Sequence, residues 1–214
     1  MEKKHLVLAS GSPRRKELLS QLGYEFSVLV TDVEECKHAQ ETAEEYVKRL
    51  SLDKALAALS LLATNPSEKQ HVASGSDTVV VSSDAISLDS ETVVLGSDTV
   101  VVSQGQVLEK PTDFSDSKRM LTQLADGRHQ VMTAVSVVSE EKQKTEIVIT
   151  DVWFKPLSEK EIEQYWQTGE PCDKAGSYGI QGLGGRFVTR IEGSYYAVVG
   201  LPLFETDQLL QEFL

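Results

Sequence analysis

The heptad GSDTVVV at 96–102 is the feature that most constrains the fold, because the chain carries it twice, with an unchanged copy at 75–81. A related run, DSETVVL, fills 89–95. Each unit places an acid and a hydroxyl directly before β-branched apolar residues, which predicts a strand with a carboxylate at its start. A carboxylate beside a buried strand is costly unless it has a partner, a metal ion or a chemical role.

Only the copy at 96–102 has a continuation that suggests chemistry. It leads into GQVLEKP at 105–111, which supplies a turn, a return strand and the cation Lys110. We therefore expect Asp98, and not Asp77, to be the functional acid. The segment at about 75–95 is interpreted as a local duplication inserted into a globular domain, and we expect the heptad copy at 75–81 on the surface or as an extra edge strand.

Strand and helix patterns alternate along the chain with no linker between them. Apolar or β-branched runs predict strands at 5–9, 25–30, 131–138, 146–154, 187–191 and 195–199. Capping residues and apolar periodicity predict helices that begin after Ser12, Thr42 and Ser158, one at 114–124 and a closing helix from Pro202. This mixture favours one α/β domain over 1–214.

The composition narrows the class of partner. The net charge of −12 argues against a protein that holds DNA or RNA through its overall field, but it allows a small anion in a local cationic pocket. No apolar run approaches the roughly 20 residues of a membrane span, and the apolar stretch after the N-terminus is too short for a signal peptide. Cys36 and Cys172 match no metal spacing, so we expect free thiols and a cytoplasmic location.

The predicted helix after Ser12 begins with two cations, Arg14 and Arg15. Cations in a first turn oppose the helix dipole and so cost stability. That cost is offset if a phosphate lies between the backbone N–H groups and the guanidinium groups. The alternative is a pair of solvated arginines on an exposed turn, and the spacing alone does not choose between them.

The polar residues at element ends suit phosphoryl chemistry, in which cations neutralise phosphate oxygens and carboxylates hold a divalent ion or activate water. Motifs for a P-loop and for a Rossmann dinucleotide site are absent, and the four histidines are scattered. The residues alone indicate an α/β protein that handles a phosphorylated small molecule, with or without a metal ion. The set comprises Ser10, Ser12, Arg14, Arg15, Glu34, Lys54, Asp98, Lys110 and Gln181.

The opening LASGSPRRKELL at 8–19 resembles the first motif of the Maf family of nucleotide pyrophosphatases. Further matches are EE at 34–35, KA at 54–55, GSDT at 96–99, EKP at 109–111, DKAGSYGIQG at 173–182 and GLP at 200–202. The resemblance implies an elongated α/β domain of the type shared with inosine triphosphate pyrophosphatases, with a mixed sheet, flanking helices and a central cleft, commonly a homodimer. It also implies hydrolysis of a nucleoside triphosphate to the monophosphate and pyrophosphate with a divalent cation, Mg²⁺ or Mn²⁺.

The SPRR and GIQG forms are similar to the branch that acts on dTTP and UTP rather than on 7-methyl-GTP. In that branch Asp98 would be the proton acceptor and could also touch the metal, which Glu34 would hold. Residues matched to nucleobase selection are Arg14, Thr99 and Gln181. Residues matched to phosphate binding are Ser10, Ser12, Arg15, Lys54 and Lys110.

One departure from the family pattern leaves a second function open. Family members usually pass from the long helix to a single Gly-x-Asp-Thr strand, whereas this chain has the segment at 75–95 between them. If that segment disabled catalysis, the protein would be a catalytically weak nucleotide-binding regulator of cell division. The complete set of polar residues around Asp98 favours the enzyme.

Overall fold

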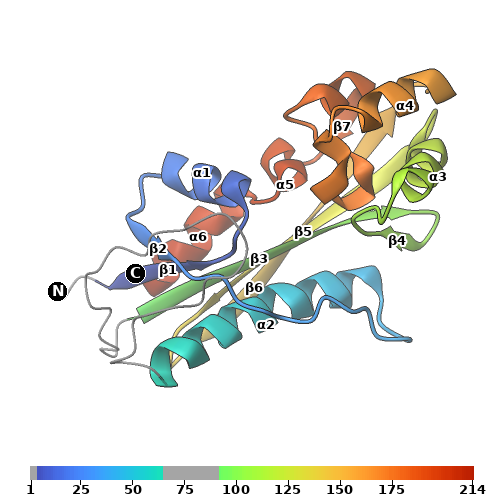
Figure 1. The fold of residues 1–214 in the computed structure, drawn as a ribbon. Coiled ribbons are helices and arrows are strands. Elements are labelled where there is room, and N and C mark those ends of the chain that lie inside the picture. The colour runs from blue at the N-terminus through green and yellow to red at the C-terminus, as the bar shows by residue number, and fades with distance from the viewer. Residues whose placement is uncertain (1–3, 65–91) are drawn as a thin grey trace.

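The structure, a computed structural model, describes residues 4–64 and 92–214. Its centre is a seven-stranded mixed sheet in the order β2-β1-β3-β5-β6-β7, with β4 paired to β3 (Figure 1). β1 is parallel to β2 and β3, whereas the remaining pairs are antiparallel. The strands are β1 (His5–Ala9), β2 (Phe26–Val28), β3 (Thr92–Ser103), β4 (Gln106–Leu108), β5 (Arg128–Val138), β6 (Gln143–Phe154) and β7 (Val188–Glu192).

Helices cover both faces of this sheet. Figure 1 shows α2 lying along one face, with α1, α5 and α6 on the other and α3 and α4 toward the far end of an elongated molecule. No described helix is long and apolar enough to cross a membrane. The helices are α1 (Pro13–Gln21), α2 (Ala43–Thr64), α3 (Phe114–Leu124), α4 (Glu159–Trp166), α5 (Tyr195–Val199) and α6 (Leu203–Phe213), with 3-10 turns η1 (Glu170–Asp173), η2 (Ala175–Ser177) and η3 (Leu183–Phe187).

Strand β3 organises the core because it is buried along nearly its whole length of 12 residues. Side chains of a strand alternate between the two faces. Val100 and Val102 therefore pack with α2, whereas Val93 and Leu95 pack with α1, α5 and α6. The expected α/β fold with an elongated mixed sheet and flanking helices is confirmed.

One edge of β3 has a gap between its neighbours, and this gap positions the cleft. β1 ends where Ala9 pairs with Gly96, and β4 begins to pair only at Val101. Between these points no strand in the described part of the chain covers that edge of residues 97–100, while β5 continues along the other edge. Side chains from both faces of β3 can therefore reach one opening.

One strand prediction is wrong, and the segment at about 75–95 is described only at its end. Residues 92–95 form the start of β3 and pair with β1, so this part of the segment lies in the central sheet. The rest of that segment, including the first heptad copy, lies outside the described residues. The strand predicted at 195–199 is the helix α5, because the Ser194 hydroxyl caps it by accepting a hydrogen bond from Ala197 N. Gly193 and Gly200, both with φ of 129°, turn the chain before and after it.

Candidate active site

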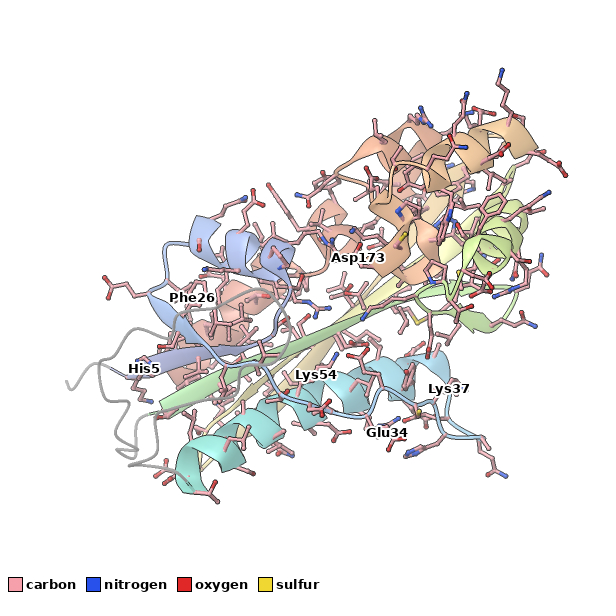
Figure 2. All side chains as sticks on the ribbon, in the orientation of Figure 1. His5, Phe26, Glu34, Lys37, Lys54 and Asp173 are labelled. Atoms are coloured by element: carbon pink, nitrogen blue, oxygen red, sulfur yellow. The ribbon has the colours of Figure 1, made fainter. Side chains whose placement is uncertain are left out.

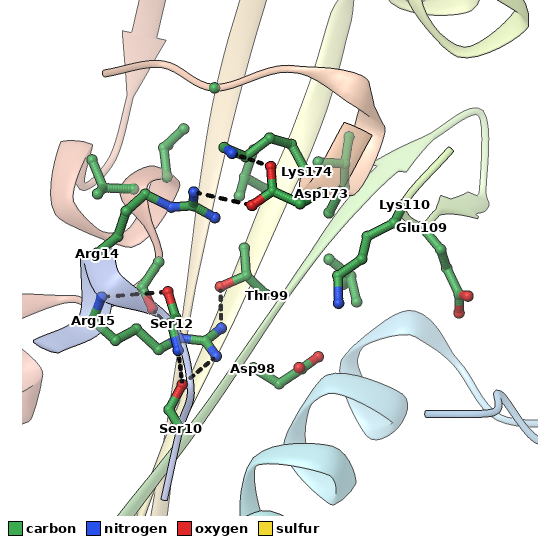
Figure 3. A pocket seen from close by; sticks show the side chains of 18 of the residues that line it. Ser10, Ser12, Arg14, Arg15, Asp98, Thr99, Glu109, Lys110, Asp173 and Lys174 are labelled. Carbon is green, nitrogen blue, oxygen red and sulfur yellow. Dashed lines mark hydrogen bonds and ion pairs between the residues drawn. The ribbon is translucent and has the colours of Figure 1, made fainter. Parts of the chain in front are cut away.

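A cavity of about 690 Å³ opens at the gap in β3. Its walls come from the end of β1, the start of α1, the segment after β4, α2 and the glycine-rich loop near residue 180, all shown from close by in Figure 3. Every site residue predicted from the sequence lines this cavity except Glu34. A cavity of this size suits a nucleotide-sized ligand.

The turn between β1 and α1 forms a cradle of donors. Ser12 caps α1, since its hydroxyl accepts a hydrogen bond from Arg15 N at 3.5 Å, and its own N–H donates to Ser10 Oγ at 3.2 Å. Pro13 fixes the first helical position, as the sequence predicts. The N-terminus of α1, at residues 12–15, thereby lines the cavity.

Arg15 crosses the cradle and is not on a solvated turn. Its guanidinium group donates to Thr99 Oγ1 at 3.2 Å and to Ser10 Oγ at 3.4 Å (Figure 3), and also to Gly200 O at 2.9 Å. These three acceptors are neutral, and burial lowers the pKa of Arg15 although the charge of Asp98 opposes that change. Arg15 is therefore not a solvated arginine, and a desolvated cation held by neutral oxygens favours binding of an anion.

A cluster of opposite charges lies across the cavity from this cradle. Lys54 of α2 donates to Asp98 Oδ1 at 2.7 Å and contacts Glu35 Oε1 at 2.6 Å. Lys110 lies 3.7 Å from Glu35 Oε2. Asp98 is buried, with 8 % of its surface exposed, yet no described residue hydrogen-bonds its second oxygen, Oδ2. That oxygen is free to accept a proton inside the cavity.

Glu35, and not Glu34, is the glutamate of this cluster. Burial opposes the ionisation of Glu35, but the hydrogen bond and charge of Lys54, helped by Lys110 and Arg15, leave its pKa lowered. Glu34 is exposed on the segment between β2 and α2, labelled in Figure 2, and lies beside the Cys36 thiol, whose pKa it raises.

Side chains of α2 fix the segment that carries Glu35. The Tyr46 hydroxyl lies 3.0 Å from Glu35 O and 2.9 Å from Glu109 Oε1, so it joins this segment to the one that carries Lys110. Burial and the neighbouring Glu109 carboxylate raise the pKa of Tyr46, which keeps the hydroxyl a donor. Sequence analysis placed Tyr46 only on the apolar face of the predicted helix and assigned it no functional role.

The site supplies two carboxylates that could bind a divalent ion, but not a complete set of protein ligands. Glu35 and Asp98 both contact Lys54 Nζ, so their oxygens are close enough to share one ion. Within 4–64 and 92–214, no group of three or more His, Cys, Asp or Glu side chains is arranged to hold a metal ion. Mg²⁺ is commonly bound by one or two carboxylates, with substrate phosphates and water completing its shell, so two carboxylates beside a phosphate cradle suffice.

The opposite wall is the glycine-rich loop, which carries Gln181 and is preceded by Asp173 and Lys174. Arg14 lies 3.9 Å from the Asp173 carboxylate, which also pairs with Lys174 (Figure 3). Burial opposes the ionisation of Asp173, but the hydrogen bond and charge of Lys174, together with the charge of Arg14, leave its pKa lowered. The motif match contained Asp173 and Lys174, yet sequence reasoning assigned neither a role.

Comparisons with known proteins agree with this geometry. The family model described as "Maf-like protein" matches residues 5–213. A Vibrio parahaemolyticus protein named dTTP/UTP pyrophosphatase is 65% identical over 209 residues, which is 98% of this chain and 97% of the relative. A protein of the same name from Vibrio cholerae is 59% identical over 97% of this chain and 97% of its own length. Another, from Photobacterium profundum, is 56% identical over 98% of this chain and 96% of its own length. The chain belongs to the Maf family.

Proposed function

We propose that this chain is a nucleoside triphosphate pyrophosphatase that hydrolyses dTTP and UTP to the monophosphate and pyrophosphate, and so removes unwanted nucleotides from the pool. The names of the relatives supply the substrates. The observation that carries the proposal is Asp98, which is fixed through one oxygen by Lys54 and keeps its other oxygen open to a cavity lined by cations.

In this proposal the cradle and the cluster share the triphosphate. Ser10, Ser12 and the N-terminus of α1 offer neutral donors to phosphate oxygens, while Arg15 neutralises charge on the same side. Lys54 and Lys110 neutralise phosphate charge from the other side of the cavity. Fixed donors and cations of this kind stabilise the charge that develops on the transferred group and on the leaving pyrophosphate.

Asp98 then acts as the general base. Oδ2 accepts a proton from a water molecule, and the oxygen of that water attacks the α-phosphorus. The bond from the α-phosphorus to the oxygen that bridges it to the β-phosphate then breaks. Pyrophosphate leaves with the electrons of that bond, and the nucleoside monophosphate keeps the oxygen of the water. Lys54 holds Oδ1 at 2.7 Å and thereby orients the carboxylate for this transfer.

Glu35 and Asp98 would hold a divalent cation, Mg²⁺ or Mn²⁺. When bound, such an ion polarises phosphate oxygens and neutralises their charge. Glu35 takes this place instead of Glu34 because it alone of the two lines the cavity.

Nucleobase selection is assigned to the remaining predicted residues, Arg14, Thr99 and Gln181, which all line the cavity. The Thr99 hydroxyl accepts a hydrogen bond from Arg15 and lies 3.0 Å from Thr133 Oγ1. Thr99 would therefore affect the nucleobase both by direct contact and by positioning Arg15. We also infer a homodimer from the family resemblance, which sedimentation would test. The side chains Tyr195 and Tyr196, exposed on α5, are compatible with an interface.

The test is release of pyrophosphate from dTTP and UTP with Mg²⁺ or Mn²⁺. Asp98→Asn removes the proton acceptor and is expected to lower kcat by about 10²- to 10⁴-fold. Asp116→Asn, on α3 and outside the cavity, is the matched control and should keep wild-type turnover. Undiminished turnover by Asp98→Asn would contradict the assignment, and tight nucleotide binding by a wild type without turnover would favour the regulator instead.

A further inference from the structure

The carboxylate of Glu170 lies beneath the glycine-rich loop and binds its backbone. It accepts hydrogen bonds from Leu183 N at 2.8 Å and from Gly184 N at 3.0 Å. A third bond comes from the Tyr165 hydroxyl at 2.7 Å, and that hydroxyl in turn accepts from Gly179 N at 3.0 Å. Both ends of the loop are thus tied to one pair of side chains.

The glycines of the loop match this pair closely. A Cβ atom on Gly182 would lie 2.5 Å from Glu170 Cδ, and one on Gly184 would lie 2.6 Å from the Tyr165 hydroxyl oxygen. Only residues without a side chain allow the backbone to approach the two groups so closely. Two of the glycines that marked this region in the sequence, Gly182 and Gly184, are therefore required by the carboxylate and the hydroxyl beneath them.

Glu170 itself is rigidly placed. Its own N–H donates to Thr168 Oγ1 at 3.2 Å, and Gly169 adopts a left-handed φ of 76° that directs the chain out of α4. Tyr165 is completely buried against Phe187, with ring centroids 5.0 Å apart. A fixed pair can serve as a template for a loop that has no regular strand or helix to hold it.

The charge of Glu170 indicates which part of a nucleotide this wall receives. All three donors to its carboxylate are neutral and no described cation forms a salt bridge with it, although the charge of Lys174 acts on it from farther away. Glu170 lines the cavity together with Gln181 and Gly182. Burial opposes ionisation, but the bonds from Gly184, Leu183 and Tyr165 leave the pKa of Glu170 lowered. A lasting carboxylate repels phosphates, so the uncharged base faces this wall.

We propose that Glu170 is a positioning residue that sets the shape of the loop at 179–185 and so places Gln181 and its neighbouring backbone against the nucleobase. The inference rests on the proposed function, since it concerns how the same site selects its substrate. Tyr165 is the second half of the template. Neither side chain needs to touch the phosphates or the attacking water.

The test compares Glu170→Gln with Glu163→Gln, an exposed glutamate on α4, and with Tyr165→Phe, which removes only the hydroxyl. A glutamine at 170 has one acceptor oxygen and turns an NH₂ group toward backbone donors. We expect KM for UTP and dTTP to rise about 10-fold with kcat changed far less, and the preference for UTP over GTP to fall. Tyr165→Phe should shift both in the same direction, and Glu163→Gln should match wild type.

Amide hydrogen exchange without nucleotide supplies a readout that does not depend on activity. Exchange at Leu183 and Gly184 should accelerate in Glu170→Gln and stay unchanged in Glu163→Gln. Unchanged exchange, or a fall in kcat alone with KM and base preference preserved, would overturn the proposal; if Glu170→Gln does not fold, Tyr165→Phe decides it. A wild type that turns over neither nucleotide would contradict the proposed function, while exchange would still show whether Glu170 holds the loop.

Discussion

At the scale of single residues, two adjacent glutamates have different environments. Both are exposed, but Glu35 contacts Lys54 and lines the cavity, whereas Glu34 does not line it. Both lie in a segment with no strand or helix, so no periodicity could tell which side chain turns inward. Contacts from a distant element decide it, because α2 fixes the backbone through Tyr46 and through a bond of 2.9 Å from Arg49 to Cys36 O.

This difference gives a paired prediction. Glu35→Gln should lower kcat/KM by about 10-fold or more and raise the Mg²⁺ concentration needed for half-maximal activity, because an amide is a poorer ligand than a carboxylate. Glu34→Gln should stay within about twofold of wild type, since changes to solvated side chains have small effects. Titration of activity against Mg²⁺ in both variants decides this, and a larger effect at Glu34 would restore the original assignment.

At the scale of elements, close packing of α2 on β3 brings the catalytic groups together. A Cβ atom on Gly96 would lie 2.9 Å from Ala55 N and would collide with Ser51 O. The helix can therefore approach the strand only where residue 96 is glycine. Lys54 precedes Ala55 and Asp98 follows Gly96 by two residues, so this contact also sets the ion pair of 2.7 Å.

Gly96→Ala should accordingly damage both stability and activity. Overpacking of this kind costs about 1–3 kcal/mol, and moving α2 away lengthens the Lys54–Asp98 contact, so kcat should fall as well. Gly127→Ala is the control, because the nearest atom to its Cβ would be 3.6 Å away. Denaturant unfolding beside the pyrophosphate assay measures both effects, and a fully stable, active Gly96→Ala would show that the close contact does not set the geometry.

Local signals in the sequence predicted most elements because they act over short distances. Ser12 and Ser158 cap helices where expected, and the helix predicted at 114–124 has those bounds in the structure. The failure at 195–199 has a tertiary cause. The β-branched and aromatic composition favoured a strand, but Ser194 N donates to Thr150 Oγ1 at 3.0 Å, which draws the chain out of the sheet and into a capped helix.

At the scale of the whole molecule, the site depends on strand ends that meet only after folding. The sequence motifs singled out Arg15 and Asp98 as site residues, and both line one cavity in the structure. The sequence could not predict that β1 stops pairing with β3 at Gly96 and that β4 pairs with β3 only from Val101, because register between strands far apart in the chain has no local signal. The same limit hid the template formed by Tyr165 and Glu170.

The buried histidine at the far end of the sheet makes stability depend on pH. His129 Nε2 lies 2.8 Å from the Tyr178 hydroxyl, and the ring packs edge-on against Phe154. Burial lowers the pKa of His129 to about 4, although Asp151 acts in the opposite direction. In an unfolded chain the pKa of histidine is about 6.5, so between these values the unfolded state binds the proton and the folded state does not.

The free energy of unfolding should therefore fall as the pH is lowered through this window, and the His129 share of the loss from pH 7 to pH 5 is about 2 kcal/mol. His129→Gln is expected to be less stable than wild type at pH 7 but to lose about that much less on acidification. His38→Gln, a change at an exposed histidine, should follow the wild-type pH dependence. Denaturant unfolding of the three proteins at pH 5, 6 and 7 measures the difference. Equal pH slopes in all three would mean that His129 takes up its proton in the folded protein, with the carboxylate of Asp151 compensating for burial.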